Sequence, residues 1–372
     1  MDQERIDQRF MAAAIRLARR NEGLTGTNPS VACVLVRDDG EGAYVIASGI
    51  TAPGGRPHAE PLALAEAGDL AKGATAYVTL EPCAHHGRTP PCAQTLIDAG
   101  VARVVTAVVD PDERVNEKGH AMLRAAGVEV SAGCMARDAA EGLAAYLIQK
   151  ANNRSQVTLK LAVSADGFIG KKGQGQVSIT GPVARAQSHL MRARHHAILV
   201  GVGTVIGDDP ELTCRLPGLE ARSPIRILLD PKGRIPLAAK TVQTAGVTRT
   251  IMVLGEGVSE THRAALRAQG CEILPCETTD GRVALPELLE DLAAIGIHSV
   301  LVEGGAKTAA AFLEEDLVDE LMLFAGAVRI GNARDAITSP VGDKQFAAFD
   351  ERESLALGED RLTRYTVRRK GR

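Results

Sequence analysis

The sequence predicts an α/β protein with two domains, at residues 1–150 and 151–372. The chain of 372 residues is longer than one hydrophobic core usually supports. Strand-like and helix-like segments alternate in both halves, as they do in layered α/β folds. Between the halves, the polar stretch QKANNRSQ at residues 149–156 is typical of a linker.

In the first half, apolar residues recur at helical spacing near the N-terminus, and two β-rich runs flank the polar turn DDGEG. We therefore expect a helix followed by a β-hairpin. A later run, ARVVTAVVD, has the composition of a strand that is buried on both faces. The expected helices lie at 6–20, from His58 onward, before Gly100, near 117–126 and near 136–150, and the expected strands at 31–37, 44–49, 74–80, 102–110 and 128–133.

The second half repeats this alternation, so a second α/β domain is expected there. The expected strands lie at 157–164, 196–201, 224–230, 248–255, 298–305 and 319–326, and the expected helices at 181–194, 259–269, 286–295 and 306–315. We find no short repeat and no low-complexity segment in either half.

The composition argues against several classes of partner. The formal charge is only −3, so no basic excess points to nucleic acid. No apolar run reaches the length of about 18 residues that a membrane span needs, and the charged N-terminus does not resemble a signal peptide. The seven cysteines are few and odd in number, which favours a reduced, cytoplasmic protein whose clustered cysteines bind metal or catalyse.

A zinc site is predicted from His58, Cys83 and Cys92. One imidazole and two thiolates leave the fourth position of a tetrahedral zinc ion open, as in catalytic zinc sites. Glu60 follows His58 closely and is the candidate proton shuttle, which takes a proton from water, passes it to a ring nitrogen and then protonates the leaving ammonia.

The His-x-Glu and Pro-Cys elements match the zinc deaminase signature, except that eight residues rather than two separate the cysteines. Core packing of the three residues is the simplest alternative for residues of these types. A deaminase that acts on a nucleoside or a tRNA base is a second alternative, and a zinc-stabilised binding protein without catalysis is a third. The histidines at 85 and 86 are equally consistent with solvated loop residues.

The long cysteine loop in ATAYVTLEPCAHHGRTPPC, together with NPSVACVLV, PHAE and DPD, closely resembles the deaminase domain of the bifunctional deaminase–reductases of riboflavin biosynthesis. The resemblance implies a cytidine-deaminase-like α/β/α fold and a small-molecule substrate, a diaminopyrimidinone that carries a phosphoribosylamino group and loses its 2-amino group as ammonia. It also implies that Asn28, His85 and Asp110 hold the pyrimidine and that Arg88 meets the 5′-phosphate.

The chain departs from that family at Asp112, where Asn is usual, and at VNEKGH (115–120), where a Val-Ala-Gly-Arg-Gly-like run is usual. A carboxylate close to a phosphorylated substrate is mildly repulsive unless it is solvated or paired. We therefore expect Asp112 to be solvated or to pair with Arg114.

In the second half, GVGTVIG (201–207) follows a strand but is a weak dinucleotide-binding signal, because Ile206 stands where the third glycine belongs. The stretch VLVEGGAKTAAAFL (300–313) is a better candidate. There a strand ends at Gly304-Gly305 and a helix begins, an arrangement that lets phosphate approach the helix N-terminus. Tight turns without any ligand use the same glycines.

LKLAVSADGFI, ITGPVAR, RARHHAILVGVGTVIGDDPELTCR and VLVEGG resemble the reductase domain of the same family, which has a dihydrofolate-reductase-like α/β fold and uses NADPH. The resemblance implies that the ribose is opened and reduced to a ribityl chain, and it weakly favours a homo-oligomer. Ser178 stands where the family commonly has Trp. The resemblance implies that Lys160 and Glu303 contact the reacting sugar and that Arg192 and Arg215 bind its phosphate. The other implied substrate residues are Gln176 and Leu212, and the implied NADPH residues are Val163, Thr204, Asp208 and Gly305.

Overall fold

The computed structural model describes residues 2–87, 90–175, 177–279, 281–331 and 334–368. Two of the predicted site residues, Arg88 and Gln176, lie outside these ranges. The chain divides into two compact units, Met1–Asn153 and Arg154–Arg372. Within the described ranges, no helix combines the length and the apolar character that crossing a bilayer requires.

The N-terminal unit is built on one sheet of strand order β2-β1-β3-β4-β5. Strand β1 is antiparallel to β2 and β3, whereas β3, β4 and β5 are parallel. The strands are β1 (Ala32–Asp38), β2 (Ala43–Ile50), β3 (Thr75–Leu80), β4 (Arg103–Val108) and β5 (Glu129–Ala132), and the α-helices are α1 (Gln3–Ala18), α2 (Ala59–Ala67), α3 (Cys92–Asp98), α4 (Lys118–Ala125), α5 (Ala136–Gly142) and α6 (Ala144–Asn152).

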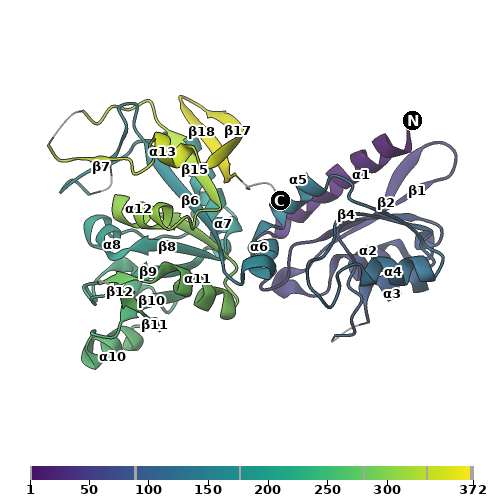
Figure 1. The fold of residues 1–372 in the computed structure, drawn as a ribbon, viewed down its shortest axis with the longest axis horizontal. Helices are drawn as coiled ribbons and strands as arrows, with labels where there is room; N and C mark the ends of the chain where they lie inside the picture. The colour runs from purple at the N-terminus through teal and green to yellow at the C-terminus, as the bar shows by residue number, and fades with distance from the viewer. Residues whose placement is uncertain (1, 88–89, 176, 280, 332–333, 369–372) are drawn as a thin grey trace. The chain divides into compact units, whose positions relative to one another are not determined.

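Helices cover both faces of this sheet, with α1 and α5 on one face and α2, α3 and α4 on the other (Figure 1). Alternate residues of β1 divide between the two cores, as strand geometry requires. Cys33 and Leu35 pack with α2 and α3, whereas Ala32 and Val34 pack with α1. The inner strands β1, β3 and β4 are mostly buried, whereas the edge strands β2 and β5 are more exposed.

The C-terminal unit has a sheet of nine described strands in the order β11-β10-β9-β8-β14-β6-β15-β18-β17. The strands from β11 to β15 are parallel, and β18 and β17 add an antiparallel hairpin. These strands are β6 (Gln156–Val163), β8 (Ala197–Gly201), β9 (Ile225–Leu229), β10 (Thr250–Gly255), β11 (Glu272–Cys276), β14 (Ser299–Glu303), β15 (Glu320–Ala325), β17 (Phe349–Leu357) and β18 (Asp360–Val367).

Helices pack on both faces of this sheet as well. Leucines of α11 and Phe312 of α12 cover one face, and apolar residues of α7, α8, α9 and α10 cover the other. The helices are α7 (Pro182–Arg194), α8 (Val202–Asp208), α9 (Lys240–Gln243), α10 (Glu260–Ala268), α11 (Leu285–Ala294), α12 (Ala306–Glu314) and α13 (Asp343–Phe346), and the short strands are β7 (Phe168–Lys171), β12 (Thr278–Thr279), β13 (Arg282–Val283) and β16 (Ala336–Thr338).

The segment before the second unit differs from expectation. The single helix expected near 136–150 is two helices, α5 and α6, which meet at the buried Leu143. The expected linker at 149–156 is largely regular structure, because α6 continues to Asn152 and β6 begins at Gln156. Helix α6 ends at Asn153, whose φ of 53° is left-handed, a common way for a helix to stop.

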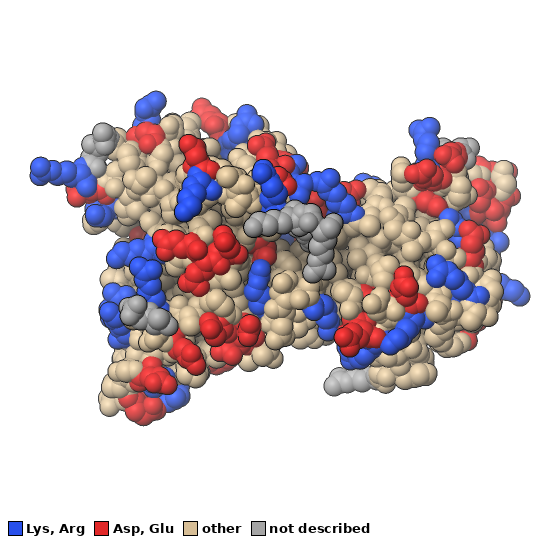
Figure 2. Space-filling view, viewed as in Figure 1, with Lys and Arg blue, Asp and Glu red and all other residues tan. Residues whose placement is uncertain are grey.

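The molecular surface carries both signs of charge. On the face shown in Figure 2, Lys and Arg side chains are interspersed with Asp and Glu side chains over both units. This matches the nearly neutral formal charge of −3.

One close backbone contact fixes helix α2 against the sheet. A Cβ atom at Gly49 of β2 would lie 2.1 Å from the carbonyl oxygen of Ala59 and 2.7 Å from the amide nitrogen of Ala63. These are backbone atoms that no side-chain rotation can move. Glycine at position 49 therefore sets how closely the first turns of α2 approach β2.

We predict that Gly49→Ala lowers the free energy of unfolding of the N-terminal unit by about 1–3 kcal/mol, the usual cost of overpacking. Urea denaturation followed by circular dichroism measures the change. Gly87→Ala is the matched control, because its added Cβ would meet only the tip of Arg56, at 3.5 Å. Equal midpoints for the two variants would contradict the prediction.

Candidate functional site

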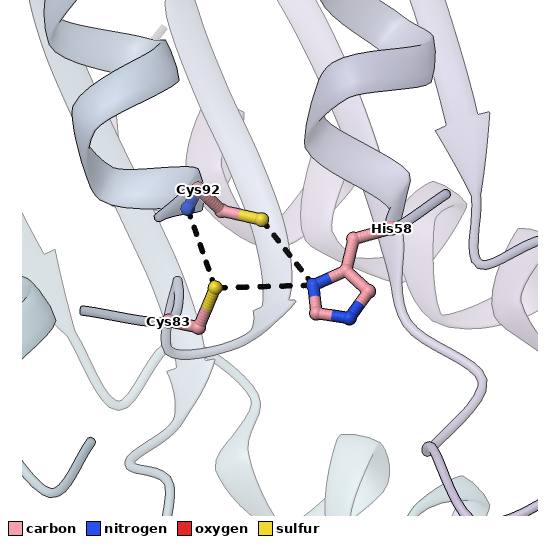
Figure 3. Close-up of side chains that lie close together, drawn as sticks. All are labelled: His58, Cys83 and Cys92. Atoms are coloured by element: carbon pink, nitrogen blue, oxygen red, sulfur yellow. Dashed lines mark hydrogen bonds between the residues drawn. The ribbon is translucent and has the colours of Figure 1, made fainter. Parts of the chain in front are cut away.

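Three potential metal ligands converge beside the sheet of the N-terminal unit. His58 is the N-cap of α2, Cys83 lies in the loop after β3, and Cys92 is the first residue of α3. Their ligand atoms all lie within 4.8 Å of one another, and this is the one such group among the described residues. Figure 3 shows both sulfur atoms directed at the same ring nitrogen, Nδ1 of His58.

The spacing of these atoms fits a zinc ion. The His58 Nδ1 atom lies 3.3 Å from Sγ of Cys92 and 3.9 Å from Sγ of Cys83. Tetrahedral zinc with ordinary bond lengths places its nitrogen and sulfur ligands about 3.5–3.8 Å apart. Since the group supplies three ligands, one coordination position is left for water or substrate, which distinguishes it from a closed structural site.

The pKa values of the two thiols shift in opposite directions. The hydrogen bond from Cys92 lowers the pKa of Cys83 to about 4, and the bond with His58 contributes. The same contact with Cys83, together with burial, raises the pKa of Cys92. The hydrogen bond with Cys83 also raises the pKa of His58. A divalent cation among these atoms would favour two thiolates and a neutral imidazole.

Glu60 is a buried carboxyl group in the first turn of α2, with only 3% of its surface exposed. Burial raises its pKa, and the negative charge of Cys83 raises it further. A carboxyl group in such surroundings exchanges a proton closer to neutral pH than an exposed one does. That property suits a general acid and base.

The predicted pyrimidine-binding residues have different surroundings. The Asn28 side chain donates a hydrogen bond of 2.8 Å to the carbonyl oxygen of Gly55. His85 lies in the loop between the two cysteines, and its buried Nδ1 atom has no hydrogen-bond partner among the described residues. His86, the neighbouring histidine, is exposed.

Asp110 lies just beyond the carboxyl end of β4 and is 5% exposed. Its Oδ1 atom accepts hydrogen bonds from the Tyr146 hydroxyl at 2.8 Å and from the Asp112 amide at 2.9 Å. Burial raises the pKa of Asp110. Asp112 forms ion pairs with Arg114 at 2.7 Å and Lys150 at 3.1 Å, so its carboxylate is paired as expected.

A second polar cluster lies in the sheet of the C-terminal unit. Lys160 of β6 and Glu303 of β14 are cross-strand neighbours in the parallel ladder. Arg192 of α7 forms two hydrogen bonds of 2.9 Å with the Glu303 carboxylate and donates to the Thr213 carbonyl oxygen at 3.0 Å. The structure thus brings three predicted residues together, although Arg192, expected to bind phosphate, is paired with Glu303.

The charges of this cluster depend on one another. Burial alone would raise the pKa of Glu303, but Arg192 and Lys160 lower it to about 2. Burial lowers the pKa of Lys160, whose ammonium lies 5.4 Å from the centre of the Phe324 ring. Glu303 therefore stays ionised, and burial makes the Lys160 ammonium a stronger acid than that of an exposed lysine.

The glycine turn after β14 lies against α8. Gly304 has a φ of 85°, and a Cβ atom there would lie 2.8 Å from the Thr204 hydroxyl. That hydroxyl accepts a hydrogen bond of 3.2 Å from the Gly305 amide. Thr204 thus covers one side of the turn, whereas Gly305 itself is exposed at the N-cap of α12, and a helix N-terminus is the kind of place where a phosphate group is bound.

The remaining predicted residues of this unit are more scattered. Asp208 is exposed at the end of α8, and Arg215 is exposed and pairs with Glu211 at 3.2 Å. Leu212 is buried, and Val163 ends β6, where it pairs with Ala325. Ser178 lines a cavity of about 400 Å³ whose wall is formed by the segments 178–183, 327–328 and 357–360.

Sequence reasoning missed Tyr146, which anchors the Asp110 carboxylate from α6. The two residues are 36 positions apart. In the sequence, Tyr146 lies within a predicted helix, where its position is typical of an aromatic residue that packs on a neighbouring element. Its only sequence signal is a polar-tipped aromatic residue in a chain with four tyrosines.

Two family models match the chain. The cytidine and deoxycytidylate deaminase zinc-binding region matches residues 4–108, and the RibD C-terminal domain matches residues 155–363. The first match ends at the carboxyl end of β4 and contains His58, Cys83 and Cys92. The second contains Lys160, Arg192 and Glu303.

Known proteins resemble nearly the whole chain. The riboflavin biosynthesis protein RibD of Bacillus amyloliquefaciens is 40% identical over 326 residues, 88% of this chain and 86% of that protein. RibD of Aquifex aeolicus is 37% identical over 364 residues, 95% of this chain and 97% of that protein.

The solved structure of a diaminohydroxyphosphoribosylaminopyrimidine deaminase/5-amino-6-(5-phosphoribosylamino)uracil reductase from Thermotoga maritima is 31% identical. Its TM-score is 0.85, and the match covers 98% of this chain and 100% of that chain. The chain therefore belongs to the RibD family and is a bifunctional deaminase and reductase of riboflavin biosynthesis, with a zinc-binding, cytidine deaminase-like N-terminal domain and a RibD reductase C-terminal domain.

Proposed function

We propose that the N-terminal unit deaminates 2,5-diamino-6-(5-phosphoribosylamino)pyrimidin-4-one and that the C-terminal unit reduces the product, 5-amino-6-(5-phosphoribosylamino)uracil, with NADPH. The observation that carries the proposal is the meeting of His58, Cys83 and Cys92 within 4.8 Å, with the buried carboxyl of Glu60 two residues from His58. The activities for which the Thermotoga maritima relative is named support the choice of substrates.

In the deaminase site, zinc held by the three ligands would supply Lewis acidity that makes water more acidic at neutral pH. The Glu60 carboxylate accepts a proton from the attacking water as its oxygen bonds to the ring carbon that bears the amino group. Glu60 then delivers a proton to the departing nitrogen, the carbon–nitrogen bond breaks, and ammonia leaves. The burial that raises the pKa of Glu60 suits both steps.

Residues around this centre would hold the pyrimidine. The Nδ1 atom of His85 has no partner among the described residues and would contact the substrate, and Asp110 is oriented by Tyr146. We assign the ring to Asn28, His85 and Asp110 and the 5′-phosphate to Arg88. Because Asp112 is paired with Arg114 and Lys150, its charge is partly neutralised and repels the phosphate less than a lone carboxylate would.

In the reductase site, NADPH supplies hydride when it is bound. The exposed Gly305 at the N-cap of α12 suits a phosphate-bearing cofactor, and Thr204 lies against the same turn. Lys160 and Glu303 lie beside each other and would orient the opened sugar, and Lys160 would handle the proton that accompanies the hydride. Arg215 is exposed and would meet the substrate phosphate. We assign Val163, Thr204 and Asp208 to the cofactor and Gln176, Arg192 and Leu212 to the substrate.

We place the boundary between the two activities near residue 150. The division into units at Asn153 and the family models that end at 108 and begin at 155 support this placement. The direct test of the whole proposal is an assay of ammonia release and NADPH consumption that starts from the diaminopyrimidinone phosphate. Cytidine is the comparison substrate, and turnover of cytidine alone would end the proposal.

We predict that Glu60→Gln keeps about one zinc ion per chain and lowers the rate of ammonia release by about 100-fold or more, because the amide cannot transfer the proton. Metal analysis and an ammonia assay measure the two effects. Glu66→Gln changes another glutamate on the same helix, one that accepts a hydrogen bond from the Ser48 amide, and should retain activity. Normal deamination by Glu60→Gln would show that the assigned proton shuttle is wrong.

We predict that Cys92→Ser loses zinc and ammonia release but keeps NADPH-dependent reduction of the uracil substrate, since the reductase cluster belongs to the other unit. Cys134→Ser is the control, because Cys134 lies outside the ligand group. Full zinc content in Cys92→Ser would remove this residue from the proposed ligands.

We predict that Lys160→Met abolishes NADPH oxidation and leaves ammonia release within about twofold of the unchanged protein. Methionine keeps the apolar stem that packs beside Phe324 and removes only the ammonium. A spectrophotometric assay of NADPH with the uracil substrate measures the effect, and Lys172→Met, at an exposed position, is the control. Loss of both activities together would contradict independent sites.

A further inference from the structure

Glu81 is a buried carboxylate with an unusual set of partners. Its Oε2 atom accepts hydrogen bonds from the amides of Asp110 at 3.3 Å and Glu117 at 3.0 Å. Its Oε1 atom accepts from the amides of Gly119 at 3.0 Å and His120 at 3.2 Å. The side chain is fully buried, and Nδ1 of His120 lies 4.0 Å from it. Four backbone donors from one stretch of chain therefore converge on a single side chain.

The position of Glu81 joins two parts of the deaminase site. It lies between β3 and Cys83, two residues before that ligand, and its own amide donates to the Val108 carbonyl oxygen at 2.9 Å. Its four partners belong to the segment 110–120, which leaves the end of β4 with Asp110 and enters α4. One carboxylate thus connects the turn that carries a metal ligand with the segment that carries Asp110.

The segment 110–120 is held close to this turn. Gly119 packs so tightly that a Cβ atom would lie 2.0 Å from the carbonyl oxygen of Pro82. Glu117 adopts a left-handed φ of 60°, which costs a non-glycine residue free energy and persists only where surrounding contacts hold it. The hydrogen bonds to Glu81 are such contacts, since they include the amide of Glu117 itself.

Only a carboxylate satisfies this arrangement. Each carboxylate oxygen accepts two hydrogen bonds, whereas a glutamine has one acceptor oxygen and an NH₂ group that would face two amide donors. Leaving a buried amide N–H without a hydrogen-bond partner lowers the stability of the folded structure around it. A change from Glu to Gln, which alters neither length nor shape, therefore releases part of the segment.

We propose that Glu81 is a positioning residue for deamination, which fixes Asp110 relative to the centre of His58, Cys83 and Cys92 through the backbone of segment 110–120. This inference rests on the proposed function, in which Asp110 holds the pyrimidine. Glu81 itself touches neither substrate nor metal. Its loss is expected to weaken substrate binding more than it slows the chemical step.

The test compares Glu81→Gln and Glu81→Asp with Glu113→Gln in the full-length, zinc-loaded protein. Glu113 is exposed on the same segment and is the matched control. Hydrogen exchange of peptides that cover 110–120 reports whether the segment is held. The KM and kcat of ammonia release report the site, zinc analysis reports the ligands, circular dichroism reports whether the N-terminal unit is folded, and NADPH oxidation with the uracil substrate reports the C-terminal unit.

For Glu81→Gln we expect about tenfold faster exchange in 110–120, a KM raised about tenfold, a kcat lowered less than about threefold and one zinc ion retained. Glu81→Asp, which keeps both oxygens but is one methylene shorter, should lie between Glu81→Gln and the unchanged protein. Glu113→Gln should match the unchanged protein. Faster exchange with an unchanged KM would overturn the proposal, and so would loss of zinc, because Glu81 would then serve the metal centre.

A second comparison places Glu81→Gln in an Asp110→Asn background. If Glu81 acts through Asp110, the double variant has a KM within about twofold of Asp110→Asn alone. If the effects of the two substitutions on KM multiply in full, the proposal is overturned.

If Glu81→Gln does not fold, the exchange rate and KM of Glu81→Asp decide, and values equal to those of the unchanged protein overturn the proposal. Absence of ammonia release by the unchanged protein would instead overturn the proposed function, while exchange in 110–120 would still test whether Glu81 holds the segment.

Discussion

The deaminase half of this enzyme depends on the close approach of α2 to the strand β2. The approach is possible because Gly49 has no side chain, so that backbone meets backbone where a Cβ would lie 2.1 Å from the Ala59 carbonyl. Helix α2 begins at His58 and carries Glu60 in its first turn. The depth at which this helix sits therefore sets the place of one metal ligand and of the acid–base group, and the loop after β3 and the start of α3 supply the sulfur atoms that complete the centre.

The second half has a different electrostatic requirement, because it buries the glutamate Glu303 and places the half-buried Lys160 and Arg192 beside it. Burying an unpaired charge costs far more than burying a paired one. Here Arg192 holds Glu303 through two hydrogen bonds, and the parallel register of β6 and β14 places Lys160 beside the same carboxylate. The result is a carboxylate that stays ionised next to an amine whose pKa is lowered by burial.

Local patterns predicted the parts of the fold that are locally determined. The β1–β2 hairpin forms around its polar turn as expected, and helix α2 begins at Ala59 with His58 as its N-cap, within one residue of the expected start. The hairpin of β17 and β18 was not predicted, because the charged, mostly exposed strand FDERESLAL lacks the alternation that marks a half-buried strand. The linker was predicted too long for a related reason. Its polar residues read as loop, yet Tyr146 and Leu147 of α6 pack on the core of the N-terminal unit and keep the chain helical.

Some residues of the candidate site were likewise predictable from local spacing, whereas others were not. The spacing of four residues is distinctive: His58, Glu60, Cys83 and Cys92. The ligand atoms of the histidine and the two cysteines lie within 4.8 Å of one another, and Glu60 is buried. Contacts between segments far apart in sequence could not be foreseen. The pairing of Arg192 with Glu303 spans 111 positions, and the Tyr146–Asp110 contact spans 36. Such contacts depend on sheet order and helix packing, which no local pattern specifies.

Two residues of α6 determine how short a separate deaminase domain can be. Tyr146 orients Asp110, and Lys150, one turn further along the helix, pairs with Asp112. Both residues lie well beyond position 108, where the likeness to cytidine deaminases ends. A shortened protein made to work as a stand-alone deaminase would therefore need to run through Asn152. An earlier truncation would remove the hydrogen-bond donor of Asp110 and an ion-pair partner of Asp112.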